Sequence, residues 1–161
     1  MKLNAVYCGP LQRTLVYAKT IVNELPTNLQ PIIDLRLNEI NYGEWSGLTN
    51  VQVQERFGIE ELETWEKYSK WPRCSGWQKS EAIVVAEVQS FTDDLIKKYK
   101  NDATILVISS NGLLRYFLKL IFNEFETRVK NQTLKIATGN FCKMTYCKNQ
   151  WNLDFWNVKP K

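Results

Sequence analysis

The sequence predicts an α/β domain with three layers, in which helices cover both faces of a mostly parallel sheet. Two observations carry this prediction. Apolar segments typical of strands alternate with segments of helical periodicity, and the run Thr104–Ile108 is apolar almost throughout. A continuous apolar run suits a strand that is buried on both faces of a parallel sheet. The length of 161 residues suits a single domain, residues 1–161, without internal repeats or linkers.

The chain begins with a strand and a helix. Asn4–Cys8 predicts a short strand, and Pro10 is placed to open a helix, where its missing N–H costs nothing. That helix stops at Pro26, and Pro31–Leu37 predicts a second strand before a loop at Asn38–Leu48. The helix has apolar residues at helical spacing, at Leu11, Leu15, Ala18, Val22 and Leu25.

Helical patterns dominate the middle of the chain. Thr49 and Gln52 have the spacing of a capping box, so we expect a helix that runs to Phe57. A short helix is predicted near Glu60–Lys70, and the longest helical pattern covers Ser80–Tyr99.

The C-terminal part begins with the apolar strand at Thr104–Ile108. The turn Ser109–Gly112 follows it, and then an apolar helix is expected from Leu113 to about Phe122. Closing strands are predicted at Leu134–Ile136, Phe141–Cys147 and Trp151–Trp156.

Composition excludes several classes of function. The sequence contains no histidine, so no imidazole serves as nucleophile, general base or metal ligand. The net charge of +4 comes from scattered basic residues without a basic stripe, which argues against nucleic-acid binding. No apolar run reaches the length of a membrane span, and no apolar signal stretch opens the chain, so we expect no membrane partner and a cytoplasmic location.

The four cysteines are Cys8, Cys74, Cys142 and Cys147. None of them forms the close pair that zinc ribbons and redox motifs use. We interpret them as free thiols in a reducing compartment. The sequence therefore predicts neither a metal site nor a cofactor.

Two segments share a design that could hold an anion. In each, a predicted strand leads directly into a helix start, where free backbone N–H groups point outward. Arg13 lies in the first turn of one helix, and Ser109, Ser110 and Asn111 precede the other. If both strands lie in one parallel sheet, these residues meet at its ligand-binding edge as a phosphate site. The alternative is that the serines and the asparagine only cap a helix and that Arg13 is an ordinary surface residue.

Three segments resemble motifs of the histidine phosphatase superfamily, the phosphoglycerate mutase-like proteins. Val6–Thr14 (VYCGPLQRT) resembles the family's VYSSPLQRT segment, Leu35–Thr49 (LRLNEINYGEWSGLT) its LxExxYGxWxGLT segment, and Ile105–Arg115 (ILVISSNGLLR) its ILVVSHGGxxR segment. They occur in the family's order and cover nearly the whole chain with the closing strands. The resemblance implies the phosphoglycerate mutase-like fold, with Arg13 as a phosphate ligand and Glu39 in the place of the proton donor.

The departures from the family bear directly on activity. Family members begin with a strand that carries an Arg-His-Gly motif, whose histidine takes the phosphoryl group. The first strand here matches the family's next strand, so the resemblance implies a truncated domain that misses the first strand-helix unit. The family's second histidine falls on Ser110 and the glycine after it on Asn111. The family's Gly-Glu-Ser before the long helix reads Gln78-Lys79-Ser80.

Phosphoryl transfer through a covalent intermediate needs a nucleophile and charge-stabilising donors. Ser110 can donate a hydrogen bond but carries no charge, and Glu39 can protonate a leaving group but has nothing left to assist. We therefore read both as remnants of a catalytic site that is not intact. Cys8 is a substitute nucleophile to weigh. Four residues separate it from Arg13, one fewer than in cysteine phosphatases, so we favour the interpretation that Cys8 only replaces a small serine.

Three functional hypotheses stay open. We favour a catalytically inactive relative, a pseudoenzyme, that binds phosphate or a phosphorylated small molecule weakly, or binds a protein partner. The second is a working phosphatase or phosphoglycerate mutase whose Arg-His-Gly segment lies upstream of Met1, although an upstream start would not explain Ser110. The third is a relic without selected activity.

The resemblance also makes a prediction about assembly. It places the Arg-His-Gly strand in the interior of the sheet beside Thr104–Ile108. Without that strand, Asn4–Cys8 and Thr104–Ile108 either pair directly or leave a gap that another chain fills. Because an open sheet edge invites association, we expect a homo-oligomer or a protein partner, with closure within one chain as the alternative.

Overall fold

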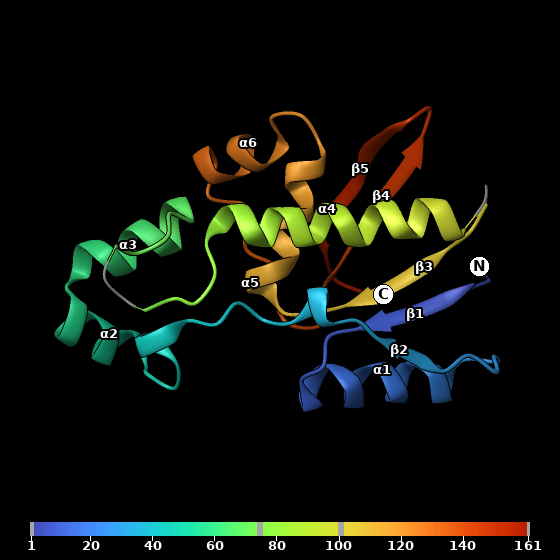
Figure 1. The fold of residues 1–161 in the computed structure, drawn as a ribbon, viewed down its shortest axis with the longest axis horizontal. Helices are drawn as coiled ribbons and strands as arrows, with labels where there is room; N and C mark the ends of the chain where they lie inside the picture. The colour runs from blue at the N-terminus through green and yellow to red at the C-terminus, as the bar shows by residue number, and fades with distance from the viewer. Residues whose placement is uncertain (1, 74–75, 100–101, 161) are drawn as a thin grey trace.

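The computed structural model describes residues 2–73, 76–99 and 102–160. Strands and a helix alternate at the N-terminus, helical segments fill the middle of the chain, and a hairpin closes it (Figure 1). In order they are β1 (Ala5–Cys8), α1 (Gln12–Glu24), β2 (Pro31–Ile33), the 3₁₀ segments η1 (Leu35–Leu37) and η2 (Gly43–Trp45), α2 (Asn50–Phe57), α3 (Ile59–Tyr68), α4 (Glu81–Lys98), β3 (Ile105–Ile108), α5 (Asn111–Leu114), the 3₁₀ segment η3 (Arg115–Leu120), α6 (Glu124–Lys130), β4 (Phe141–Cys147) and β5 (Gln150–Val158).

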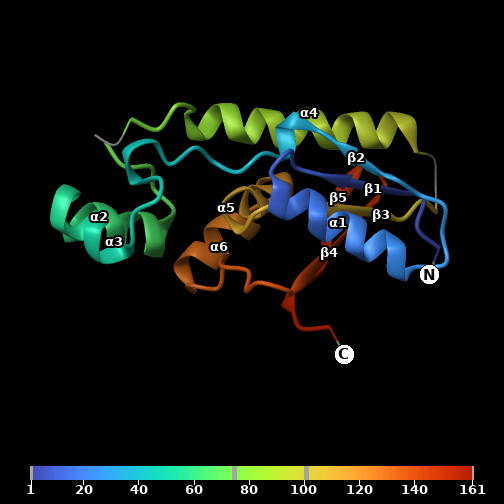
Figure 2. The ribbon, with the colours of Figure 1, turned by 90° about the horizontal axis from the view of Figure 1, so that it is seen from below.

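The fold has the predicted three layers, because successive residues of β1 point to opposite faces of the sheet. Tyr7 faces α4, where it meets the ring of Phe91 edge-on at a centroid distance of 5.5 Å. Val6 and Cys8 face α1 and belong to the cluster that contains Ala18. Figure 2 shows the strands between α4 and α1. Helices thus cover both faces of the sheet.

The central sheet is parallel, with strand order β2-β1-β3. β1 and β3 pair over their full length, with Ala5 opposite Ile105 and Cys8 opposite Ile108. Of the two arrangements open on the sequence, the structure therefore has the direct pairing within one chain. The gap between these two strands, which was the reason to expect a homo-oligomer or protein partner, is therefore closed. The expected partner itself stays a prediction. β4 and β5 form a separate antiparallel hairpin.

Two strand predictions are wrong, one in its extent and the other entirely. The strand expected at Pro31–Leu37 ends at Ile33, because the carboxylate of Asp34 accepts a hydrogen bond from the backbone N–H of Arg36 at 2.9 Å and opens η1 instead. Leu134–Ile136 is buried but forms no strand. Side chains bind its backbone: the indole of Trp156 donates to the carbonyl of Leu134, and the side chain of Asn111 accepts from the N–H of Ile136.

Most helix predictions are confirmed. The capping box at Thr49 and Gln52 has both of its reciprocal bonds, and Ser80 caps α4. The apolar helix expected from Leu113 to Phe122 is wrong, because α5 has a single turn and continues as 3₁₀ in η3. α6 has no counterpart among the sequence predictions, although its acidic first turn and basic last turn complement a helix dipole.

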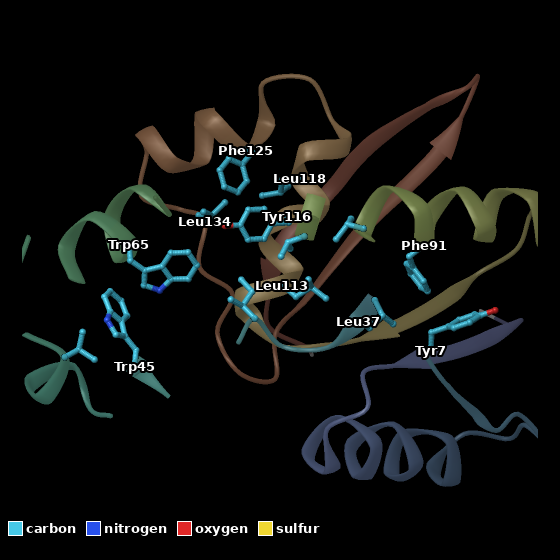
Figure 3. Packing of buried hydrophobic residues seen from close by; sticks show 14 of the residues in the cluster. Tyr7, Leu37, Trp45, Trp65, Phe91, Leu113, Tyr116, Leu118, Phe125 and Leu134 are labelled. Carbon is cyan, nitrogen blue, oxygen red and sulfur yellow. The ribbon is translucent and has the colours of Figure 1, made fainter. Parts of the chain in front are cut away.

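The main core joins the sheet to the helical segments on its α4 side (Figure 3). Tyr116 of η3 lies at its centre, fully buried and stacked on Phe125 of α6. The indole of Trp71 donates to the hydroxyl of Tyr116 at 2.7 Å and so ties the α2–α3 region to this centre. That region lies beyond the start of α4, away from the strands, in both ribbon views. The aromatic contacts thus anchor the protruding helices to η3 and α6 in the core.

Candidate functional site

The site forms where β1 and β3 end side by side. The backbone N–H of Gly9, just after β1, donates to the carbonyl of Ile108 at 3.0 Å. A side chain at Gly9 would collide with the carbonyl of Leu37, so glycine lets η1 approach this junction. η1 in turn carries the chain to Glu39. Three segments far apart in the sequence therefore meet here.

Arg13 links those segments. It is the second residue of α1, and 62% of its side chain is exposed. Its Nη2 donates to Oε2 of Glu39 at 3.3 Å and to Oγ of Ser110 at 3.2 Å. We call Arg13, Glu39 and Ser110 the Arg13 cluster. Because strong charge-assisted hydrogen bonds are about 2.7–2.9 Å long, the arginine holds both partners loosely, and a ligand anion could replace the carboxylate.

The other carboxylate oxygen of Glu39 also accepts hydrogen bonds, which fix its position. Oε1 accepts the backbone N–H of Ile40 at 3.1 Å and the hydroxyl of Tyr42 at 3.5 Å. Burial raises the pKa of Tyr42 well above its usual range, and the negative charge of Glu39 raises it further, so the phenol keeps its proton and stays a donor. A methyl group on Gly112 would collide with the Tyr42 hydroxyl and lie 2.5 Å from Oε1 of Glu39. Gly112 is therefore needed for this arrangement.

The other two predicted ligands point to internal partners. The hydroxyl of Ser109 donates to the carbonyl of Leu37 at 2.8 Å, and Oδ1 of Asn111 accepts from the backbone of Ile136 at 2.8 Å. Of the four residues predicted to bind phosphate, the structure brings together Arg13 and Ser110. Ser109 and Asn111 instead hold neighbouring segments in place around them.

Arg115 is a residue at this site to which the sequence patterns assigned no role. It is 7% exposed, and its guanidinium lies 4.7 Å from the centroid of the Trp65 ring. It donates to Oγ of Ser69 at 2.8 Å and to the carbonyl of Asn111 at 3.4 Å. Within the described ranges no carboxylate lies in ion-pair distance of it, and burial lowers its pKa. Only its place at the end of the third motif could have drawn attention to it.

Arg115 therefore joins the protruding helices to the turn that carries Ser110. Ser69, its partner, ends α3 in a left-handed conformation with φ of 52° and is buried. A buried arginine keeps its charge, since its pKa lies far above neutral pH even when burial lowers it. With Arg13 it adds a second cation near Glu39, although the carboxylate of Glu66 also acts on Arg115.

The structure argues against Cys8 as a nucleophile. Its side chain is fully buried between β1 and α1, and burial raises the pKa of its thiol. A neutral, inaccessible thiol is a poor nucleophile. Cys142 and Cys147 are free thiols as predicted, whereas Cys74 lies outside the described residues.

Membrane spans and metal clusters are both missing from the part of the chain that the structure describes. No helix there has the length and apolar character needed to cross a membrane. No group of three or more cysteine, aspartate and glutamate side chains there is placed to hold a metal ion.

Comparison with known proteins supports the resemblance seen in the motifs. The model of the histidine phosphatase superfamily (branch 1) matches residues 1–159. The 2,3-bisphosphoglycerate-dependent phosphoglycerate mutase of Corynebacterium diphtheriae is 24% identical over 84% of this chain. Phosphoserine phosphatase 1 of Hydrogenobacter thermophilus is 30% identical over 70% of this chain. The matched regions span only 63% and 51% of the lengths of these two relatives.

Solved structures share the fold. A mycobacterial glucosyl-3-phosphoglycerate phosphatase in complex with inorganic phosphate superposes with a TM-score of 0.77 at 20% identity, covering 98% of this chain and 78% of that one. A phosphoserine phosphatase mutant from Entamoeba histolytica, in complex with phosphoserine, has a TM-score of 0.70 at 19% identity, covering 96% and 73%.

Proposed function

Because the chain belongs to the histidine phosphatase superfamily, we propose that it is a catalytically inactive member that binds phosphate or a phosphorylated small molecule weakly at the Arg13 cluster. The observation that carries this proposal is the contact between Arg13 and Ser110, at the position where the family has its second histidine. The anion-binding arginine is kept, while a neutral hydroxyl stands in place of an imidazole.

The chemistry of the cluster supports binding without turnover. A phosphoryl group on Arg13 and Ser110 would receive hydrogen bonds from a guanidinium and a hydroxyl. The 161 residues contain no histidine to accept the phosphoryl group, and the Cys8 thiol is buried. Glu39 could donate a proton to a leaving group, but proton donation alone does not supply the missing nucleophile.

Glu39 also makes the binding weak. Its carboxylate already occupies Arg13 at 3.3 Å, so an incoming anion has to displace it and then lies beside its negative charge. The groups that hydrogen-bond to this carboxylate are Arg13, the Tyr42 hydroxyl and the backbone of Ile40, and the charge of Arg115 also acts on it. Removing the charge at this position removes the competition. We therefore expect phosphate to bind more tightly to the Glu39→Gln variant than to the wild type.

The competing hypothesis is a phosphatase or phosphoglycerate mutase that needs an Arg-His-Gly segment from outside this sequence. The shorter length relative to the curated relatives favours it. Ser110 counts against it, because an additional segment would not restore the second imidazole.

The cytoplasmic location remains part of our proposal, supported by the free thiols of Cys8, Cys142 and Cys147.

Turnover assays test the proposal. The purified 161-residue chain should hydrolyse para-nitrophenyl phosphate, and convert 3-phosphoglycerate, no faster than a buffer blank. The Arg13→Ala variant serves as the matched control for contaminating phosphatases, because it alters only this site. Activity that survives repurification and disappears in Arg13→Ala would show that the chain is an enzyme.

A further inference from the structure

The outward face of α1 carries a groove that begins at the Arg13 cluster. The groove has a volume of about 530 Å³ and is lined by Gln12, Arg13, Val16, Tyr17 and Thr20. These residues recur at spacings of three and four, which places them on one face of the helix. Arg13 belongs both to the groove and to the site. The groove is shallow and wide open to solvent, so a ligand whose anionic group meets Arg13 could extend along α1.

Next to the charged Arg13, the groove is lined by the apolar side chain of Val16 and the aromatic ring of Tyr17. Val16 is 53% exposed and Tyr17 is 50% exposed, although the opposite face of α1 buries Ala18 and Val22 against the sheet. Helical side chains tilt toward the N-terminus of their helix, so Val16 and Tyr17 lean toward the turn that holds Arg13. Among the five lining residues, Arg13 is the only ionisable group that is charged at neutral pH.

We propose that this groove selects a small phosphomonoester whose alcohol part is apolar or aromatic. The inference rests on the proposed phosphate site. The phosphate meets Arg13 and Ser110, and the alcohol part lies against Val16 and Tyr17. The negative phosphate complements the one cation of the groove, and its volume is in the range of small-molecule sites, about 300–1,000 Å³. A sugar or glycerol moiety needs many hydrogen-bond partners and would find few here beside Arg13: Gln12, the hydroxyl of Tyr17, and Thr20, whose hydroxyl already donates to the carbonyl of Val16 at 3.0 Å.

The expected effect follows from the area that an aromatic ring would cover. Burying one face of a phenyl ring on Val16 and Tyr17 is expected to make phenyl phosphate bind about tenfold more tightly than inorganic phosphate. Glycerol phosphate carries a similar charge without the ring. It should bind about as tightly as inorganic phosphate.

The experiment compares these three ligands on the full chain by titration calorimetry. Tyr17→Ala should lose the advantage of phenyl phosphate and keep its affinity for inorganic phosphate. Val16→Ser should reduce the same advantage, which guards against a fold defect peculiar to one variant. Arg13→Ala should lose affinity for all three ligands. Tyr68→Ala is the matched control, because Tyr68 is also 50% exposed but lies on α3.

The outcomes separate the two proposals. If inorganic phosphate binds but phenyl phosphate has no advantage, the groove assignment is wrong and the phosphate site stands. The groove assignment is equally wrong if the advantage survives in both Tyr17→Ala and Val16→Ser. If no ligand binds to the wild-type chain, the phosphate site itself is refuted.

Discussion

The two strand-helix units at the site begin alike and end differently. β1 and β3 are both four-residue strands, paired with each other, and each leads into a helix at the same edge of the sheet. After β1 the chain forms the 13-residue α1, on which Arg13 is largely exposed. After β3 it forms the single turn of α5 and then η3, where Leu113 and Tyr116 are buried in the core.

The difference lies in where the polar side chains are used. In the β3–α5 unit, Ser109 binds the carbonyl of Leu37 and Asn111 binds the backbone of Ile136, so both stabilise the fold. In the β1–α1 unit, Arg13 makes only long contacts of 3.2 and 3.3 Å and is open to solvent. The β3–α5 unit therefore contributes Ser110 and otherwise supports the site, whereas the β1–α1 unit presents the cation that a ligand would meet.

The largest effect is expected from crowding the supporting unit. Gly112→Ala places a methyl group against the Tyr42 hydroxyl and Glu39. Because the Tyr42 ring is packed edge-on against Trp65 and Trp77 and cannot move away freely, we expect the free energy of unfolding to fall by about 2 kcal/mol. For a chain of this length the melting temperature should fall by about 6 °C. Thermal unfolding followed by circular dichroism measures this.

The matched glycine is Gly139, where an added side chain would meet nothing within 4 Å. Its φ of +83° favours asparagine among the larger residues, so Gly139→Asn should change stability by less than about 1 kcal/mol. Equal melting temperatures for Gly112→Ala and the wild type would show that Glu39 and Tyr42 are not held as described.

A second pair of variants compares a residue that stabilises the fold, Asn111, with a residue that is exposed to a ligand, Arg13. Asn111→Ala leaves the buried N–H of Ile136 without its partner and should cost about 1–2 kcal/mol of stability. Arg13→Ala removes an exposed, loosely paired side chain and should cost less than about 0.5 kcal/mol. Urea unfolding of both variants checks this. If Arg13→Ala were the more destabilising of the two, the division of roles between the units would be wrong.

A third, smaller effect depends on pH. Asp34 opens η1, which carries the carbonyl that Ser109 binds, and the guanidinium of Arg36 holds the pKa of this carboxyl below its usual range. A lowered folded-state pKa contributes stability above the unfolded pKa, near 4, and this contribution is lost as the pH falls through the folded value. The free energy of unfolding of Asp34→Asn should therefore be lower than that of the wild type by about 1 kcal/mol at pH 7. It should also change less with pH between pH 5 and 3. Parallel stability curves for the two proteins would contradict this.

The smallest effect is chemical. Cys147 is exposed on the hairpin, whereas Cys8 is buried in β1 with a raised thiol pKa. A maleimide at pH 8 should therefore modify Cys147 first and leave Cys8 unmodified until the protein unfolds, as read by peptide mass spectrometry. Modification of both at one rate would mean that β1 is not an interior strand.

Much of the fold could be predicted from local patterns. The apolar run after Thr104 identified β3, and the side-chain spacing of Thr49 and Gln52 identified the start of α2, because each signal arises within a few residues. The motifs likewise placed Arg13, Glu39 and Ser110 in one site, and the structure brings them together.

The errors occur where long-range contacts outweigh local preference. Leu134–Ile136 has an apolar pattern suited to a strand, but its backbone is bound by Trp156 and Asn111, which are distant in the sequence. Because Oδ1 of Asn111 accepts the hydrogen bond from Ile136, it is not available to a ligand. No local sequence pattern could show that Ser110 faces the site and Asn111 does not. Apart from its place at the end of the third motif, Arg115 had no local signal, because its partners, Ser69 and Trp65, come from a different segment.

The most direct test of the account is a calorimetric titration of the 161-residue chain with inorganic phosphate. We predict millimolar binding by the wild type, a loss of about tenfold or more in Arg13→Ala, and tighter binding in Glu39→Gln, which no longer places a carboxylate on the arginine. The absence of binding at millimolar phosphate, or equal affinities for the wild type and Arg13→Ala, would contradict the assignment of this cluster as a phosphate site.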